Sequence, residues 1–344
     1  MAELAREAGV SASTASRALR NSPLISKETI ERVQTIAKEH SYRPHLGARN
    51  LRLKKNNVIV LVLPFNYAEE DVLGNPYIFK IIGTIGSKLR EHGYDLLLSQ
   101  MDDISEEIDN RYVHAGIAEG AIILGRGDND TEKLQRLEET GIPFVILGPI
   151  LDNQSYCSVG IDNRASAKMA VHHLATLGRK RIAIVSDNRE DPNSESFARF
   201  QGYRQALGEL EYQYDQNLVG PSAHSGESGN AAVQELLQKA PDLDAIFVAT
   251  SDVVAISVMQ ALRNAGKSIP EDVAIVGFDN IDMCNFVSPS LTSISQRLKD
   301  QVANLLVQKL LDQINGKSVE SVMLNGSLVV RRSCGSQTDY PLRV

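Results

Sequence analysis

Residues 5–19 read AREAGVSASTASRAL, and this stretch decides the fold at the start of the chain. Its apolar spacing predicts a short helix over residues 3–8 and a second helix over residues 12–20. Gly9 can adopt the positive φ of a tight turn between the two helices, and Ser11 can cap the second one. A helix, a tight turn and a polar-faced helix in this order indicate a helix-turn-helix unit.

A third helix completes the unit and sets the role of the second. Ser26 can cap this helix, Ile30 and Val33 begin its apolar stripe, and it is predicted to end near residue 40. In helix-turn-helix units the second helix reads the major groove. The candidate DNA contacts on it are Ala12 and Ser13 at base edges, Arg17 at guanine, and Thr14 and Ser16 at phosphates. The alternative is a generic three-helix bundle with no DNA role.

The charge of the chain is unevenly distributed. The 344 residues carry a formal net charge of −7. Residues 1–56 hold eleven Lys or Arg and five Glu, a net of +6, which leaves −13 for the remaining residues. This asymmetry indicates a basic, polyanion-binding head on an acidic body, and the alternative is a solvated helical face.

Composition excludes several classes of protein. A hydrophobic content of 42% supports a real core, and the length suggests roughly two to three domains. The three cysteines are far apart and form neither a CxxC nor a Cys/His spacing, so we predict no disulfide scaffold, no metal and no cofactor. The charged opening segment does not resemble a signal peptide, and no apolar run is long enough to span a bilayer. A cytoplasmic protein is therefore expected.

Residues 57–344 alternate strand and helix patterns. Short apolar strands are predicted at 58–63, 95–98, 121–124, 144–147, 181–185, 245–249 and 273–277, with helical patterns between most of them. This alternation predicts an α/β fold of two doubly wound lobes with parallel sheets. A cleft between two such lobes is a natural small-molecule site.

Several motifs resemble those of the LacI/GalR family of bacterial transcription regulators, and together they cover essentially the whole chain. They are Gly9-Val10-Ser11-x-x-Thr14-x-Ser16-Arg17-x-Leu19, Tyr42-x-Pro44, Ala48-Arg49-x-Leu51, Gly160-Ile161-Asp162-Asn163, Arg199-x-x-Gly202-Tyr203 and Val276-Gly277-Phe278-Asp279. The resemblance implies an all-α helix-turn-helix headpiece followed by a core of the type I periplasmic-binding-protein fold.

The resemblance also implies where the domains begin and end. The helix-turn-helix domain takes residues 1–44, a hinge helix or linker residues 45–56, and the effector-binding and dimerisation domain residues 57–344. Within the last, the first lobe is expected over about 57–158 and 292–317 and the second over about 159–291 and 318–334. In the hinge, Leu51 matches a leucine that wedges into the minor groove, and Ala48 and Arg52 are further expected DNA contacts.

An effector site follows from the same resemblance. Arg199 matches an arginine that forks onto effector hydroxyls, and Asp279 matches a carboxylate that accepts from them, a combination suited to a polyol. Ser251 and Asp252 stand where relatives often carry Asn-Asp. The alternatives are a surface ion pair for the first two residues and a helix cap for the other two. Two more contacts are expected in loops that line the cleft: Arg126 and His224.

The chain departs from the family pattern in its first helices. Ala15 stands where valine is common, Arg20-Asn21 stands where asparagine usually follows the leucine directly, and the chain opens almost at the first helix. These departures leave the expected fold in place but make the operator sequence unpredictable.

The function expected from the resemblance is regulation of transcription by a small molecule. We predict a repressor of sugar-utilisation genes that binds a pseudo-palindromic operator as a homodimer and responds to a sugar or glycoside. The alternative is a cytosolic sugar-binding receptor with no DNA role, for which a basic head would have no purpose. No Ser/His/Asp or Cys/His constellation is found, so an enzyme is not predicted.

Overall fold

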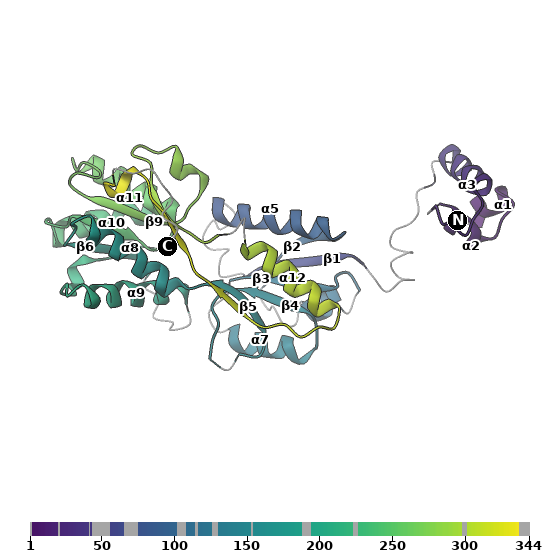
Figure 1. The fold of residues 1–344 in the computed structure, drawn as a ribbon, viewed down its shortest axis with the longest axis horizontal. Coiled ribbons are helices and arrows are strands. Elements are labelled where there is room, and N and C mark those ends of the chain that lie inside the picture. The colour runs from purple at the N-terminus through teal and green to yellow at the C-terminus, as the bar shows by residue number, and fades with distance from the viewer. Residues whose placement is uncertain are drawn as a thin grey trace. The chain divides into compact units, whose positions relative to one another are not determined.

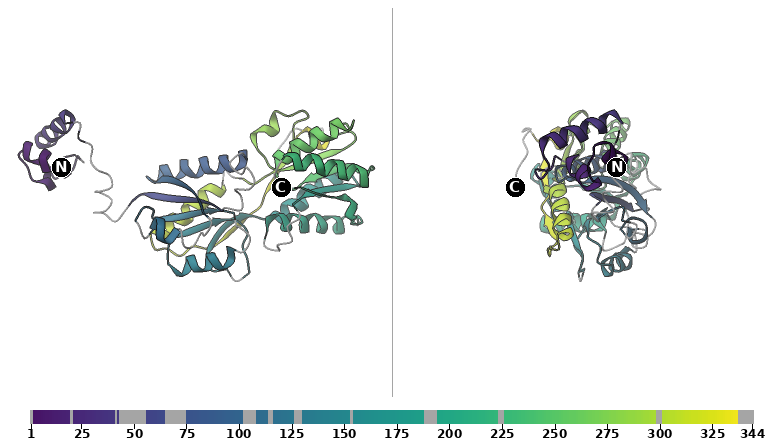
Figure 2. Two further views of the ribbon diagram at one scale, coloured as in Figure 1. Left: turned by 180° about the vertical axis from the view of Figure 1, so that it is seen from behind. Right: turned by 90° about the vertical axis from the view of Figure 1, so that its right-hand side faces the viewer.

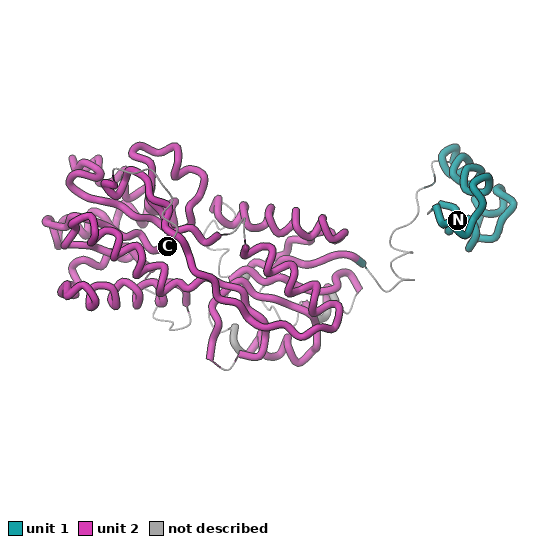
Figure 3. The backbone as a smooth tube through the Cα atoms, viewed as in Figure 1, with its two compact units in different colours: residues 1–56 teal, residues 57–344 magenta. Residues whose placement is uncertain are grey.

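A computed structural model of the chain describes residues 2–19, 21–40, 42, 56–64, 75–101, 108–113, 116–125, 130–152, 154–187, 194–222, 226–297 and 301–336. The chain divides into two compact units, residues 1–56 and residues 57–344 (Figure 3). The larger unit begins where the alternating strand and helix patterns of the sequence begin.

The described part of the smaller unit holds the helices α1 (Ala2–Glu7), α2 (Ala12–Ala18) and α3 (Lys27–Glu39). Gly9 has a φ of +63° in the turn between α1 and α2, a conformation that glycine adopts without strain. Ser11 Oγ accepts a hydrogen bond from Thr14 N at 3.1 Å, and Ser26 Oγ accepts one from Thr29 N at 3.3 Å. These caps pair N–H groups that a helix start otherwise leaves unpaired, so local side chains decide where α2 and α3 begin.

Small side chains form the core of this unit. Ala15 and Ala18 have no exposed surface, so α2 lies close against its neighbours. Leu4 of α1 and Val33 of α3 pack in the same cluster. The helix-turn-helix arrangement predicted from the spacing of small residues is therefore present.

The first lobe of the larger unit contains a six-stranded parallel sheet with the order β11-β5-β4-β3-β1-β2 (Figure 1). Its strands are β1 (Val58–Pro64), β2 (Asp95–Met101), β3 (Gly120–Leu124), β4 (Phe144–Leu147), β5 (Cys157–Ile161) and β11 (Val322–Leu324). Because the sheet is covered on both faces, its strands appear in the sequence as nearly continuous apolar runs.

Alternate residues of β1 show the two covered faces of this sheet. Ile59 and Leu61 belong to the core that includes side chains of α5 (Pro76–Glu91) and α12 (Ala303–Ile314). Val60 and Val62 pack instead with residues of η3 (Ile108–Val113) and α7 (Asp130–Glu139).

The second lobe contains a sheet with the order β12-β10-β9-β8-β6-β7. Its strands are β6 (Ile182–Ser186), β7 (Val219–Pro221), β8 (Ala245–Val248), β9 (Ala274–Asp279), β10 (Thr292–Ser295) and β12 (Ser327–Val329). β12 is antiparallel to β10, and the other pairs are parallel. α8 (Asn163–Thr176) and α9 (Glu195–Glu209) pack together on one face, and α10 (Gly226–Lys239) and α11 (Asp252–Asn264) on the other (Figures 1 and 2).

The lobe boundaries expected from the sequence are wrong at three strands. β5 pairs with β4 in the first sheet, although residues from 159 onward were assigned to the second lobe. β10 pairs with β9 in the second sheet, although residues from 292 onward were assigned to the first lobe, whereas α12 packs on α5, β3 and β4 of the first lobe as expected. β11 pairs with β5 in the first sheet, although residues 318–334 were assigned to the second. Backbone pairing decides these memberships, and the periodicity of a strand three to five residues long does not reveal its partner.

The described residues hold neither a helix suited to crossing a membrane nor a cluster suited to a metal ion. None of their helices is both long enough and apolar enough to cross a membrane. No group of three or more His, Cys, Asp or Glu among them is arranged to hold a metal ion.

Candidate DNA-binding face and effector site

The predicted DNA-contacting residues of α2 lie away from its buried alanines. Ala12, Ser13 and Arg17 are exposed, and Thr14 and Ser16 are half-buried. Arg17 is in the last turn of the helix. Since the opposite side of α2 is packed into the core, this polar side is the one available to a ligand of the smaller unit.

Two hydroxyl groups on this face already take part in the helix cap. Ser11 Oγ lies 2.8 Å from Ser13 Oγ and 2.9 Å from Thr14 Oγ1. A hydroxyl has a single hydrogen to donate, so Ser11 can donate to only one of these two hydroxyls and the other must donate to Ser11. At most one of Ser13 and Thr14 therefore keeps its hydrogen for a phosphate oxygen. The three expected hinge contacts lie outside the described residues: Ala48, Leu51 and Arg52.

In the second lobe, predicted effector residues meet at the carboxyl ends of the parallel strands. Asp279 ends β9, Ser251 and Asp252 follow β8, and Arg199 extends from α9. Ligands of open α/β sheets bind at this edge. The two remaining expected contacts, Arg126 and His224, lie outside the described residues.

Arg199 is 4% exposed and its guanidinium makes four hydrogen bonds. Nε donates to Asn163 Oδ1 at 2.7 Å, and Nη2 donates to Glu195 Oε2 at 3.4 Å. Nη1 donates to the carbonyl oxygens of Ala249 at 2.7 Å and Thr250 at 3.1 Å. Since a guanidinium has five N–H donors, these contacts leave one Nη2 hydrogen for a ligand.

An aromatic ring supports the same guanidinium. Arg199 Cζ lies 3.7 Å from the centroid of the Phe278 ring, a cation–π contact in a buried setting. Arg199 is therefore held rigidly by the fold, and it is buried rather than a member of a surface ion pair.

Asp279 provides an acceptor beside this cation. Its side chain is buried, and Oδ1 accepts a hydrogen bond from Gln296 Nε2 at 2.7 Å. No described residue donates a hydrogen bond to Oδ2. Burial raises the pKa of Asp279 well above its usual range and the neighbouring Asp252 raises it further, while the positive charge of Arg199 lowers it. The φ of Asp279 is +105°, a conformation rare for residues with a side chain.

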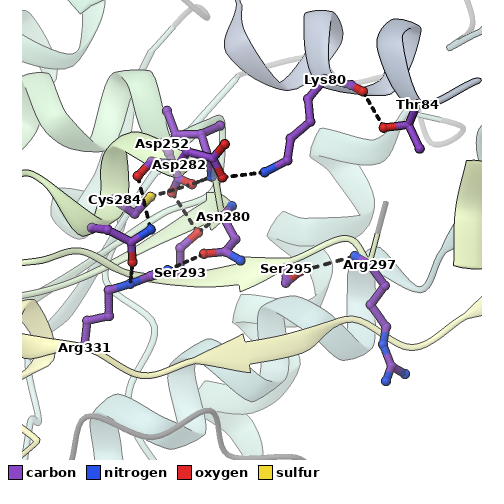
Figure 4. A network of polar contacts seen from close by, with 12 residues as sticks. Lys80, Thr84, Asp252, Asn280, Asp282, Cys284, Ser293, Ser295, Arg297 and Arg331 are labelled. Carbon is purple, nitrogen blue, oxygen red and sulfur yellow. Dashed lines mark hydrogen bonds and ion pairs between the residues drawn. The ribbon is translucent and has the colours of Figure 1, made fainter. Parts of the chain in front are cut away.

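Asp252 is held entirely by the protein. It is fully buried, and its Oδ1 accepts from Ser293 Oγ at 2.7 Å (Figure 4). Its Oδ2 accepts from Ile281 N at 3.0 Å and from Cys284 Sγ at 3.1 Å. Burial raises the pKa of Asp252 to about 6, an effect that these hydrogen bonds partly offset. This carboxylate joins α11, β10 and the segment after β9.

Ser251 is also buried, at 1% exposure. Its Oγ accepts a hydrogen bond from Val254 N at 3.4 Å, which makes Ser251 the N-cap of α11. This contact is the helix cap that the sequence left open as the alternative to effector binding.

Residues that position the site were not assigned from the sequence. Asn163 and Glu195 hold Arg199, and Gln296 holds Asp279. Asn163 stood in a recognised motif, so a signal for it existed. Gln296 has no such signal, because it becomes a neighbour of Asp279 only when β10 pairs with β9.

The two units together define a class of protein: a helix-turn-helix unit joined to a two-lobed α/β domain. Comparison with known families agrees. Residues 1–45 match the bacterial regulatory proteins of the lacI family, and residues 171–334 match the periplasmic binding protein-like domain.

Relatives extend the likeness over nearly the whole chain. The HTH-type transcriptional regulator CelR of Thermobifida fusca is 32% identical, over 95% of this chain and 95% of that protein. The HTH-type transcriptional repressor CytR of Escherichia coli strain K12 is 30% identical, over 97% and 95% of the two chains. The solved complex of the regulator CelR with cellobiose shares 30% identity and a TM-score of 0.72, covering 96% of this chain and 98% of that one. The chain belongs to the lacI family of DNA-binding transcriptional regulators, whose members are not enzymes.

Proposed function

We propose that this protein is a transcriptional repressor whose operator affinity is controlled by a sugar or glycoside bound between its lobes. The observation that carries the proposal is the arrangement at the edge of the second sheet. Asp279 Oδ2 accepts no hydrogen bond from the described residues, and Arg199 keeps one Nη2 hydrogen. Together they offer a charged acceptor and a charged donor to neighbouring hydroxyl groups.

Burial gives these two groups their effect. Hydrogen bonds to charged groups are stronger than those between neutral groups, and a rigidly held donor loses little entropy on binding. A polyol replaces the water at such groups with several matched hydroxyls. A relative is known in complex with cellobiose, so cellobiose is the first probe to use.

Asp279→Asn tests the effector site. The substitution keeps an oxygen for Gln296 and removes the charge that the effector hydroxyls contact. Cellobiose affinity, measured by isothermal titration calorimetry alongside other disaccharides and simple sugars, is expected to fall about ten- to a hundredfold, with DNA binding retained. Equal affinity of the variant and the natural chain for the sugar that binds would refute the assignment.

Arg17→Ala tests the DNA-binding face. If Arg17 reads a guanine, its loss costs about 1–3 kcal/mol at one base-pair position of the operator. Gel shifts on operators altered one base pair at a time measure this, and Arg6→Ala, on the exposed side of α1, is the control. A uniform loss over all operators would instead place Arg17 at a phosphate.

The proposed homodimer has a candidate face on both lobes. Phe79 on α5 is 58% exposed, and Met283 and Phe286, next to β9, are 52% and 85% exposed. A hydrogen bond between Lys80 and Asp282 brings these two segments together. Exposed large apolar groups that gather in one place are typical of interfaces.

Phe286→Ser tests this face. The substitution is expected to shift the chain from dimer to monomer in sedimentation experiments, because it removes the most exposed aromatic group of the face. Leu24→Ser, at a 79% exposed leucine of the other unit, is the matched control. A dimer as stable as that of the natural chain would place the interface elsewhere.

A further inference from the structure

An ion pair joins the two lobes beside the proposed effector groups. Lys80 Nζ, on α5 of the first lobe, donates to Asp282 Oδ1 at 2.8 Å (Figure 4). Asp282 begins η5 (Asp282–Asn285), a short helix that follows β9 in the second lobe. Because 202 positions separate the two residues, the contact forms only in a particular placement of one lobe on the other.

The lysine end of the pair is held by a rigid helix. Ile81 and Ile85 of α5 are completely buried against the first sheet. Lys80 itself is only 22% exposed at its side chain, and its carbonyl oxygen accepts a hydrogen bond from Thr84 Oγ1 at 2.7 Å. The ammonium group therefore moves together with the first lobe.

The aspartate end is held from beneath. Asp252 Oδ2 accepts hydrogen bonds from Ile281 N and from Cys284 Sγ, one residue before and two residues after Asp282. Since Asp252 is fully buried, η5 follows the movement of α11. Asp282 therefore moves together with the second lobe.

Arg331 holds the same segment from the side. Its Nη2 donates to Asn280 Oδ1 at 2.8 Å, and its Nε donates to Asn285 Oδ1 at 2.9 Å. Arg331 follows β12, and the chain passes from the first lobe to the second between β11 and β12. The segment 279–285 is thus tied to a crossing between the lobes.

This segment carries both the effector carboxylate and the ion pair. Asp279 is its first residue, and Asp282 lies three positions further along. A shift of Asp279 on effector binding is transmitted to Asp282, because hydrogen bonds hold the residues between and around them. The pair then breaks or forms as the lobes change position.

We propose that Lys80 and Asp282 form a latch between the lobes that stabilises one lobe arrangement and thereby sets operator affinity. Only an arrangement that brings α5 to η5 gains the interaction, which is the requirement for shifting a two-state equilibrium. Asp282 is 74% exposed, so water screens the pair. The expected bias is about two- to fivefold, enough to tune the equilibrium without locking it.

The latch is tested without DNA or sugar by hydrogen–deuterium exchange of the full chain. Asp162 N donates to Leu324 O at 2.8 Å, where two of the chain segments that connect the lobes run side by side. Exchange of this amide is therefore expected to change when the lobes move, and peptides that contain it are the ones to follow. In Lys80→Met and in Asp282→Asn their exchange is expected to be about two- to fivefold faster. The double variant is expected to exchange no faster than either single variant, because both single changes remove the same ion pair.

Lys88→Met is the matched control. Lys88 lies on the same helix, and its ion pair with Glu91 Oε1, at 3.1 Å, lies within one lobe. In Lys88→Met the peptides that contain the Asp162 amide are expected to exchange at the same rate as in the natural chain. Exchange that Lys80→Met and Asp282→Asn leave unchanged would overturn the latch, as would an equal acceleration by Lys88→Met.

The regulatory part rests on the proposed function and is tested on DNA. The natural chain selects a duplex from random DNA, and the affinity of each variant for that duplex is measured at equal oligomeric mass, checked by sedimentation. Both single variants and the double variant are expected to change affinity by the same two- to fivefold factor. Faster exchange with unchanged affinity would overturn the regulatory role. A natural chain that selects no duplex would refute the proposed function and this role with it, while the exchange result alone still decides the latch.

Discussion

Arg199→Leu tests the structural role of this residue, apart from its proposed role in binding. The change removes the guanidinium while leaving an apolar side chain on α9. Its hydrogen bonds to Asn163 Oδ1 and to the carbonyl oxygens of Ala249 and Thr250 are lost. Leucine has no donor to replace them, so three acceptors at the carboxyl edge of the second sheet lose a partner.

The magnitude follows from these three acceptors. A buried acceptor without a partner costs about 1–3 kcal/mol, and breaking a buried charged network costs about 3–5 kcal/mol. The contact with the Phe278 ring is lost as well. Removing the positive charge of Arg199 also raises the pKa of Asp279 further, which lessens the cost of leaving this carboxyl group without its cation. We expect the free energy of unfolding to fall by about 3–5 kcal/mol.

The assay is urea unfolding followed by far-ultraviolet circular dichroism, because the chain contains no tryptophan. Arg204→Leu is the control on the same helix. Arg204 is exposed, and its Cζ lies 5.0 Å from the centroid of the Tyr214 ring, so its loss is expected to cost less than about 1 kcal/mol. If both variants unfold at the same urea concentration, the burial and bonding of Arg199 do not stabilise the fold as argued.

Three other changes test the packing and electrostatics of the second lobe. A Cβ on Gly202 would lie 2.3 Å from Arg164 O, so Gly202→Ala is expected to destabilise the fold by about 1–3 kcal/mol. Gly208 on the same helix has open space around it, so Gly208→Ala is expected to be neutral or stabilising. Thermal unfolding of the two variants compares these effects. Burial raises the pKa of Asp252 to about 6, so the folded chain keeps a proton that the unfolded chain releases. The contribution of Asp252 to the free energy of unfolding should therefore fall by about 2–3 kcal/mol as the pH rises from about 4 to above 6, and urea titrations in which the natural chain gains stability relative to Asp252→Asn over this range would contradict this sign. Thr250 Oγ1 is buried with no hydrogen-bond partner among the described residues, so Thr250→Val should raise thermal stability by about 1 kcal/mol relative to Thr250→Ser, and a loss would show that the hydroxyl has a partner.

The smaller unit and the alternation of elements were predictable because their signals are local. Gly9 sits in its turn with a positive φ, and Ser11 and Ser26 cap the helices that follow them. Each of these effects involves residues within a few positions of one another. The buried strands of the two sheets are likewise visible as apolar runs, since helices cover both of their faces.

The proposed effector residues were predictable in part. The family pattern pointed to Arg199 and Asp279, and both lie at the carboxyl edge of the second sheet. It pointed equally to Asp252, whose oxygens the structure shows bound to Ser293, Ile281 and Cys284. A motif indicates which residues stand at a site, whereas burial and hydrogen bonds decide which of their atoms are left for a ligand.

By itself the sequence determined that a basic helix-turn-helix head precedes an acidic body of two α/β lobes. Only the tertiary structure decided which sheet β5, β10 and β11 join, and therefore where the chain crosses between the lobes. It also decided that Gln296 holds Asp279 and that Lys80 reaches Asp282 across the lobes. The physical reason is the range of the interactions: caps and turns act within one element, whereas strand pairing and interlobe contacts join residues that only the completed fold brings together.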